Sequence, residues 1–286
     1  MDNLAVSTAL FEGHDMAVAF DEIARAGLHK AEPAFIAGYS EFNEDTLSES
    51  NAKQLTRLAA GSGLTIAAVS AHMDIGRPGD ATVRHLERRI RFVSACDCKV
   101  LITNAGLAAD LDRIQATLEA ILPLAEFLGV MIALENPGHG EGAAIHDISS
   151  GRSLIARLDH PLVRLNYDVG NVYTYSAATL QPGEDLKRHD LSGVGYIHLK
   201  DIYAMGADWS FCPLGDGLID LADLFDVIGT RFPISLEIPL HLFRPGRGAP
   251  VKAEARLPID QLREALARSL NSLHSIVVAP LKNGPY

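Results

Sequence analysis

Four residues that can bind a metal ion stand at the ends of successive apolar runs. They are Glu135, Asp168, His198 and Glu237, and the runs cover residues 130–135, 162–168, 194–198 and 233–237. A charged group at the end of a buried strand costs free energy unless it is paired or bound to a cation. Four such positions in succession, each at the C-terminal end of its run, indicate one shared metal site. We therefore expect metal-dependent chemistry on a small polar substrate.

The donor set narrows the choice of metal. Two glutamates, one aspartate and one histidine supply mostly oxygen ligands with a single nitrogen. Carboxylates suit Mg2+ and Mn2+, whereas imidazole raises the affinity for Co2+ and Zn2+. We expect one divalent ion, favour Mn2+, and leave Mg2+, Co2+ and Zn2+ open. For any single member of the set, the alternative is a structural ion pair or a capping carboxylate.

Further polar residues stand at or near the ends of the other runs. Glu32, His72 and Asn104 end the second, third and fourth runs and are candidates for substrate contact. His72 is also a catalytic candidate. Lys200 lies two residues after His198, so both side chains share one face of a strand and Lys200 would place a catalytic cation beside the metal. The competing interpretations are an ordinary turn or core residue for His72 and a buried ion pair for Lys200.

Four loop residues are further candidates for substrate binding: Asn171, His139, Trp209 and Arg244. Asn171 could hydrogen-bond a hydroxyl, and His139 lies in a glycine-rich loop that could fold over the substrate. Arg244 carries a planar fork that suits carboxylate or phosphate. Trp209 could form an apolar wall of the pocket. Turn formation, loop anchoring or a subunit contact is the alternative interpretation for these residues.

Apolar runs alternate with amphipathic stretches along the chain. The expected strands cover residues 4–10, 28–35, 64–71, 99–104, 130–135, 162–168, 194–200 and 233–238. The expected helices cover residues 14–26, 44–60, 82–95, 110–128, 148–158, 184–191, 220–228 and 259–276. This alternation predicts an α/β fold, a (β/α)8 TIM barrel forming a single domain over residues 1–286, with the site at the C-terminal ends of the strands. An open doubly wound sheet is the alternative, but no glycine-rich phosphate turn follows the first run.

Composition excludes some classes of partner. The 286 residues carry a formal net charge of -11, whereas nucleic-acid binding needs clustered Lys and Arg. No apolar run approaches the ~18 residues of a membrane span, and no N-terminal signal stretch is visible. Three cysteines, Cys96, Cys98 and Cys212, do not make a disulfide framework. We expect a cytoplasmic protein that binds no nucleic acid or membrane, and assembly into a homo-oligomer (dimer or tetramer) stays open.

With these residues in place, the chain resembles the sugar phosphate isomerase/epimerase family, the xylose isomerase-like TIM barrels, over nearly its whole length. The resemblance rests on LEN at 134–136, YDVGN at 167–171, HLKD at 198–201, PLGDGLID at 213–220 and SLEIP at 235–239. It implies a small-molecule sugar or polyol ketone as substrate and one divalent metal held by the four residues named first. It also implies that Glu135 and Glu237 lie on opposite sides of the substrate carbon. One removes a proton next to the carbonyl and the other returns it, through a metal-stabilised enediolate.

One departure affects the expected outcome of the reaction. Ketose 3-epimerases of the tagatose type usually carry a histidine three residues after the aspartate ligand, where this chain has Asn171. HLKD instead resembles the inosose dehydratase and dehydroshikimate dehydratase branches. A metal-dependent dehydratase (lyase) of a cyclic polyol ketone such as inosose or 3-dehydroshikimate is therefore the alternative function. In that reaction Lys200 or His72 could protonate the leaving hydroxyl.

Two other classes share the superfamily barrel. An apurinic endonuclease needs a trinuclear zinc site with extra histidines, but Asn104 and Asn171 stand where two of them would be expected. A non-catalytic binding protein on the same fold is the other, since fold does not imply activity. The complete set of ligand candidates favours an enzyme.

Overall fold

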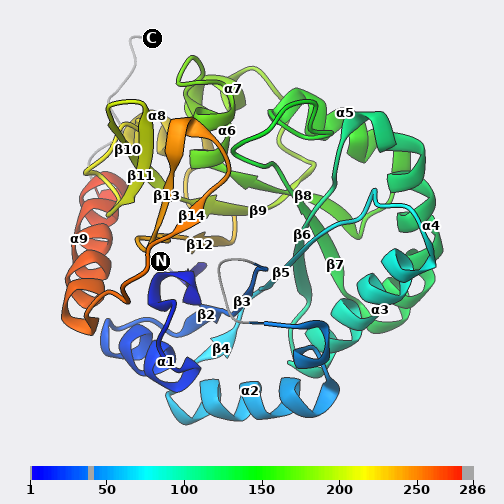
Figure 1. Cartoon of the computed structure of the whole chain (residues 1–286), viewed down its shortest axis with the longest axis horizontal. Coiled ribbons are helices and arrows are strands. Elements are labelled where there is room, and N and C mark those ends of the chain that lie inside the picture. The colour runs from blue at the N-terminus through cyan, green and yellow to red at the C-terminus, as the bar shows by residue number, and fades with distance from the viewer. Residues whose placement is uncertain (1, 38–41, 279–286) are drawn as a thin grey trace.

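Parallel strands form the centre of the molecule, and helices form an outer ring around them (Figure 1). The computed structural model describes residues 2–37 and 42–278. The barrel strands are β1 (Leu4–Ser7), β2 (Lys30–Glu32), β3 (Ala34–Phe35), β4 (Thr65–Ile66), β5 (Val69–Asp74), β6 (Val100–Asn104), β7 (Met131–Glu135), β8 (Val163–Asp168), β9 (Val194–Leu199) and β12 (Ile234–Leu236). Their apolar side chains are buried, as expected where helices cover a parallel sheet.

The sheet closes on itself through two broken strands. Its order is β3-β5-β6-β7-β8-β9-β12-β1-β2-β4, and every pairing is parallel. β2 and β3 are two parts of one barrel strand, and so are β4 and β5. Because β2 pairs with β4 and β3 pairs with β5, the two ends of the sheet meet. The fold is therefore the predicted (β/α)8 TIM barrel.

The helices follow the predicted alternation with small shifts in their bounds. They are α1 (Met16–Arg25), α2 (Glu49–Gly61), α3 (Asp80–Ala95), α4 (Leu111–Leu128), α5 (Ile148–Leu158), α6 (Val169–Tyr175), α7 (Pro182–Lys187), α8 (Leu221–Ile228) and α9 (Ile259–Val278). Short 3-10 turns occupy Thr8–Phe11, Glu44–Thr46, Ala108–Asp110 and Pro245–Arg247. No helix in the described part of the chain is long and apolar enough to cross a membrane.

The prediction was wrong in detail around the first three barrel strands. The first strand ends at Ser7 rather than at residue 10, because the Ser7 hydroxyl accepts a hydrogen bond from the backbone of Ala9 and begins a 3-10 turn. The second breaks at Pro33, which has no N–H to donate to a neighbouring strand. β5 continues to Asp74, so His72 lies within a strand rather than after it.

Two connections also differ from the prediction. Between the sixth and seventh barrel strands there are two helices, α6 and α7, where one was expected near residues 184–191. α6 begins directly after β8 because the Asp168 carboxylate accepts a hydrogen bond from the backbone of Asn171 and caps the helix. The predicted loops after the seventh and eighth strands form an antiparallel rim sheet of β10 (Asp201–Met205), β11 (Asp208–Cys212), β13 (Leu242–Arg244) and β14 (Val251–Lys252).

Strand register brings the candidate ligands to one edge. Glu135 pairs with Asn166, and Asp168 pairs with His198. Ser235 pairs with His198 in turn, and the residue two positions beyond Ser235 is the fourth candidate ligand. The C-terminal ends of four adjacent strands therefore meet.

The contact between the first and last helices gives a pH prediction. Glu22 on α1 is buried and accepts two hydrogen bonds of 2.8 Å from Arg263 on α9. These bonds lower the pKa of Glu22, so the contact stabilises the fold at pH values above about 4.3, where the unfolded carboxyl is ionised. That stability is lost as pH falls through the lowered folded pKa.

We expect the unfolding free energy of Glu22→Gln to fall less than that of the parent protein when the pH is lowered from 6 to below about 4.3, because the variant has no carboxyl group to protonate at this position. Urea titrations at each pH measure the unfolding free energy. The exposed Glu119, which lies on α4, supplies the matched control Glu119→Gln. Identical acid dependence in the parent protein and Glu22→Gln would contradict the assignment.

Candidate metal centre

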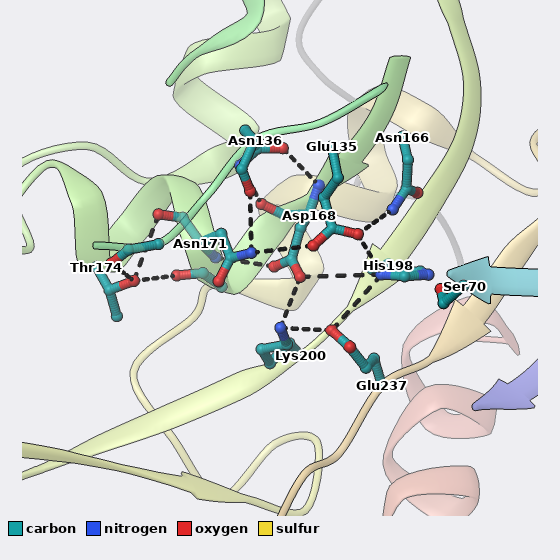
Figure 2. Close-up of polar contacts among 12 residues, drawn as sticks. Ser70, Glu135, Asn136, Asn166, Asp168, Asn171, Thr174, His198, Lys200 and Glu237 are labelled. Atoms are coloured by element: carbon teal, nitrogen blue, oxygen red, sulfur yellow. Dashed lines mark hydrogen bonds and ion pairs between the residues drawn. The ribbon is translucent and has the colours of Figure 1, made fainter. Parts of the chain in front are cut away.

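The four candidate ligands converge on one buried point. Glu135, Asp168 and His198 end or nearly end β7, β8 and β9, and Glu237 follows β12 directly. One ligand atom from each lies within 4.8 Å of the others, and none of the four residues is more than 3% exposed. Figure 2 shows their side chains pointing toward one another. The structure thus brings together the whole predicted ligand set.

His198 is held in one orientation by Glu32, which lies 166 residues earlier in the chain. Its Nε2 lies 3.0 Å from Glu32 Oε2, and Glu32 Oε1 accepts a 2.7 Å hydrogen bond from Ser70. An ionised carboxylate only accepts hydrogen bonds, so Nε2 carries the proton. In the neutral imidazole, Nδ1 is then a lone-pair donor directed toward Glu135 Oε2 at 3.0 Å. A carboxylate behind a ligating histidine fixes the ring in this way at metal sites.

Substrate contact by Glu32 stays a prediction, and in this structure the residue supports His198 instead. The residue is fully buried and both of its carboxylate oxygens have partners within the protein. It lies behind His198 and cannot reach a substrate without losing those bonds.

The residues present fit a divalent cation. Asp168 Oδ2, His198 Nδ1 and Glu237 Oε2 are buried and make no hydrogen bond of good geometry. Lys200 forms ion pairs with the two carboxylate oxygens but not with His198 Nδ1, and a metal cation is the ligand that would bind all three atoms together. Four buried carboxylates, counting Glu32, face one buried ammonium, that of Lys200. When His198 is neutral, as metal binding requires, this leaves three negative charges, of which a divalent ion would neutralise two.

The pKa values of the ligands reflect this excess of negative charge. Burial raises the pKa of Asp168 to about 7, against the opposing effect of Lys200. Burial disfavours charge on His198, but Glu32, Glu135 and Glu237 raise the pKa of its imidazole well above the ordinary value. A bound metal would take the place of the proton at Nδ1.

Lys200 lies within the centre, as its strand position predicts. Its Nζ is 2.7 Å from Asp168 Oδ2 and also forms an ion pair with Glu237 Oε2. Despite burial, these carboxylates raise the pKa of Lys200. Lys200 and His198 in turn hold the pKa of Glu237 well below its usual range against the effect of burial. The buried ion pair and the predicted cation beside the metal site are therefore the same feature.

Two asparagines that support the ligands were not among the predicted site residues. Asn166 donates a 2.6 Å hydrogen bond to Glu135 Oε2. The Asn136 side chain bonds the backbone of Asp168 in both directions, at 2.9 and 3.0 Å. Asn166 lies two residues before Asp168 on the same strand face, so the period of two could have identified it.

His72 and Asn104 lie beside Glu135. The His72 Nε2 is 3.7 Å from Glu135 Oε2 and makes no hydrogen bond of good geometry. Asn104 pairs with Glu135 in strand register and is half-buried. Both remain candidates for substrate contact at the mouth of the barrel.

Asn171 and Arg244 are buried and hydrogen-bonded to each other at the rim of the barrel. Arg244 Nη1 donates to Gly138 O and Thr174 Oγ1, each at 2.6 Å, and Nη2 donates to Asn171 Oδ1 at 3.0 Å. Asn171 Nδ2 donates to the backbone oxygen of Asn136 at 3.0 Å. Both groups are buried and bond to the protein in this structure, and their binding of substrate stays a prediction.

Two predicted substrate contacts remain: His139 lies near the metal centre and Trp209 lies in the rim sheet. His139 is half-buried, and burial together with Arg244 and Lys200 lowers the pKa of its imidazole, so it faces the charged centre. Trp209 is 1% exposed and packs edge-on against Tyr173 in the rim sheet. Trp209 therefore anchors the rim, which was the alternative interpretation, and does not form an open wall.

Asp201 joins two sequence motifs that the resemblance singled out. Its buried carboxylate accepts four backbone hydrogen bonds of 2.9–3.2 Å, one from its neighbour Ile202 and three from Gly215, Gly217 and Ile219. A Cβ added at Gly217 would come within 2.1 Å of this carboxylate, so the loop needs glycine there. The bonds fix the chain immediately after Lys200.

Comparison with known proteins identifies the family. The family model described as the xylose isomerase-like TIM barrel matches residues 20–268. The chain belongs to this family. A search of curated protein sequences finds no match.

Solved structures with the same fold share little sequence with this chain. A xylose isomerase-like TIM barrel/4-hydroxyphenylpyruvate dioxygenase fusion protein has a TM-score of 0.71 and 18% identity over 96% of this chain, which spans only 42% of that protein. D-psicose 3-epimerase with D-tagatose from Clostridium cellulolyticum H10 has a TM-score of 0.72 and 15% identity, covering 96% of this chain and 99% of that one. The IOLI protein with a bound zinc atom has a TM-score of 0.69 and 15% identity, covering 98% and 99%.

The position of Glu32 behind His198 gives a binding prediction. We expect Glu32→Gln to lower the affinity for Mn2+ about 10–100-fold, because the amide no longer favours the tautomer with a free Nδ1. Competition with a fluorescent chelator measures the affinity. Glu119→Gln is the control with unchanged affinity, and equal affinity in Glu32→Gln would show that Glu32 has no part in orienting the imidazole.

The Asp201 contacts give a stability prediction. Asp201→Asn replaces an acceptor oxygen with an NH2 group that faces backbone donors, so we expect a loss of about 1–3 kcal/mol of unfolding free energy in urea titrations. Asp208→Asn is the matched control, since Asp208 accepts a single backbone bond, from Gly246 at an exposed position. Equal losses in the two variants would contradict the special role of Asp201.

Proposed function

We propose that the protein is a divalent-metal-dependent isomerase or epimerase of a sugar or polyol ketone, which removes a proton from the carbon beside the carbonyl. The observation that carries the proposal is the convergence of Glu135, Asp168, His198 and Glu237 on one buried point at the strand ends. A divalent ion bound there supplies Lewis-acid chemistry, since it stabilises negative charge that develops on the substrate oxygen. A zinc-bound structure of similar fold supports metal binding in general, and the oxygen-rich donors favour Mn2+.

Two carboxylates reach the centre from separate strands. β8 and β9 lie between β7 and β12 in the sheet, yet Glu135 Oε2 and Glu237 Oε2 are 3.0 and 3.5 Å from His198 Nδ1. A ketone bound between Glu135 and Glu237 presents opposite faces of its reacting carbon to them. One carboxylate removes the proton and the other returns it to the opposite face, which inverts that carbon.

The surroundings of each carboxylate suit it for moving a proton. Glu135 Oε2 is held by Asn166, whereas Oε1 receives only a 3.4 Å contact from Asn171, so Oε1 is the oxygen that can accept a proton. Lys200 beside Glu237 keeps the second carboxylate ionised. His72 stands beside Glu135 to bind a substrate oxygen.

A dehydratase is the second candidate because of Lys200. Its ammonium group lies beside both Asp168 and Glu237, where a leaving hydroxyl would be bound. After a carboxylate has taken the proton next to the carbonyl, the bond to the β-hydroxyl breaks. The hydroxyl leaves as water with a proton from Lys200 Nζ or His72.

Deuterium uptake in D2O tests both candidates. Metal-loaded and chelated protein would be incubated with ketoses, inososes and dehydroshikimate and followed by NMR. We expect metal-dependent exchange at a carbon beside the carbonyl, and a loss of at least about 100-fold in its rate in Glu135→Gln or Glu237→Gln. A new epimer or isomer supports the first candidate, and a dehydrated enone supports the second. Metal-loaded protein that exchanges no proton on any of these compounds would overturn the proposal.

Lys200→Met separates the candidates further. If Lys200 protonates a leaving hydroxyl, the variant retains proton exchange but forms dehydrated product more slowly by about 100-fold or more. An epimerase forms no dehydrated product with or without Lys200, so in that case the substitution changes only the rates of exchange and epimer formation.

A further inference from the structure

A cavity of about 400 Å³ lies at the same end of the barrel as the metal centre. It occupies the space between the ends of the first, second and eighth barrel strands. Thr8 in its lining follows Ser7, which pairs with Glu32 in strand register. His241, also in its lining, is four residues after Glu237. The cavity therefore begins where the strands that support the metal centre end, and its size is within the range of small-molecule sites.

His241 is the unusual group in this cavity. It is only 5% exposed, yet neither of its ring nitrogens has a hydrogen-bond partner among the described residues. Burial, with a contribution from Lys252, lowers its pKa to about 4, so at neutral pH one nitrogen can donate and the other can accept. A buried imidazole with neither bond made costs free energy. A ligand that both accepts and donates hydrogen bonds would remove that cost.

The charges around the cavity disfavour an anionic ligand. The lining includes two carboxylates, Glu12 and Asp15, and one ammonium group, that of Lys252. It also includes the imidazole of His14, whose Nε2 lies 3.0 Å from Leu257 O. Lys252 Nζ is already 2.7 Å from Glu12 Oε1. α1 begins at the cavity, but its N-cap position is occupied by Asp15, which places a carboxylate there. Phosphate and carboxylate ligands need unpaired cationic donors, and the described lining offers none.

The walls of the cavity combine apolar and polar side chains. Phe11 and Phe35 contribute aromatic surface, and Ala9 and Ala34 contribute small side chains. A sugar or cyclic polyol has apolar C–H faces and hydroxyl edges. Aromatic and aliphatic side chains beside placed polar groups can contact both parts of such a molecule.

We infer that this cavity binds the part of the substrate remote from the reacting carbon, and that this part is neutral and carries hydroxyl groups. The inference rests on the proposed function of the metal centre. His241 donates a hydrogen bond to one hydroxyl and accepts one from another, while Phe11 and Phe35 contact the C–H faces. The substrate is accordingly an unphosphorylated polyol ketone.

Two variants of His241 test the inference. His241→Phe removes both the donor and the acceptor and leaves no polar atom unsatisfied, so we expect its melting temperature to be no lower than that of the parent protein. His241→Gln keeps one donor and one acceptor. With a neutral ketose or inosose as substrate, we expect His241→Phe to raise KM about three- to tenfold with little change in kcat, and His241→Gln to restore KM in part. The exposed His274 on α9, which lies outside the cavity lining, gives the control His274→Gln.

A binding measurement makes the test independent of turnover. In protein labelled with 15N-histidine, the His241 signals are those absent from the spectrum of His241→Phe. We expect neutral ketoses or inososes to shift these signals, and D-fructose 6-phosphate to shift them less than D-fructose does. If the neutral compounds leave the His241 signals unchanged, or if the phosphate ester binds more tightly, the inference is overturned.

The outcomes separate the two proposals. Proton exchange with an unchanged KM in His241→Phe overturns the role of the cavity and leaves the proposed function intact. Shifted His241 signals without proton exchange on any compound support the cavity and overturn the proposed function.

Discussion

The repulsion among buried carboxylates at the end of the barrel is the constraint on which the rest of the site depends. Glu32, Glu135, Asp168 and Glu237 surround His198, and none is more than 3% exposed. Charges in such a place are tolerated only when cations and hydrogen-bond donors surround them. Lys200 supplies one positive charge, and a divalent ion would neutralise two of the three negative charges that remain.

Neutral donors complete the surroundings without changing the charge. Asn166, Asn171 and Ser70 direct amide or hydroxyl hydrogens at carboxylate oxygens. Each of these side chains comes from a different barrel strand or the helix that follows one. The carboxylates are therefore fixed before any ligand binds, which is the condition for electrostatic stabilisation of a reacting group.

The sequence was informative where a charge interrupts an apolar run. The four candidate ligands were predicted from that pattern, because a shared cation stabilises four such charges, and Lys200 was predicted from its position two residues after His198. The barrel was predicted from the alternation of apolar runs and amphipathic stretches. Roles that depend on contacts between distant segments did not follow. Glu32 bonds His198 across 166 residues and Arg244 bonds Gly138 across 106, and no local spacing records either contact. The rim sheet was missed because its strands are only two to five residues long and lie in segments rich in turn-forming residues.

The contacts of Arg244 bear on when the site forms during synthesis. Its partners Gly138, Asn171 and Thr174 leave the ribosome 70 to 106 residues before it does. Glu237, the last ligand of the centre, lies only seven positions ahead of Arg244. A nascent chain that ends after the seventh barrel strand contains Glu135, Asp168 and His198 but not Glu237. It also lacks Arg244 and therefore the hydrogen bonds that this residue makes across the rim. A metal ion that binds all four candidate residues could therefore do so only after the eighth strand has been synthesised, and a chain truncated before that strand lacks both Glu237 and the strand that closes the barrel between β9 and β1.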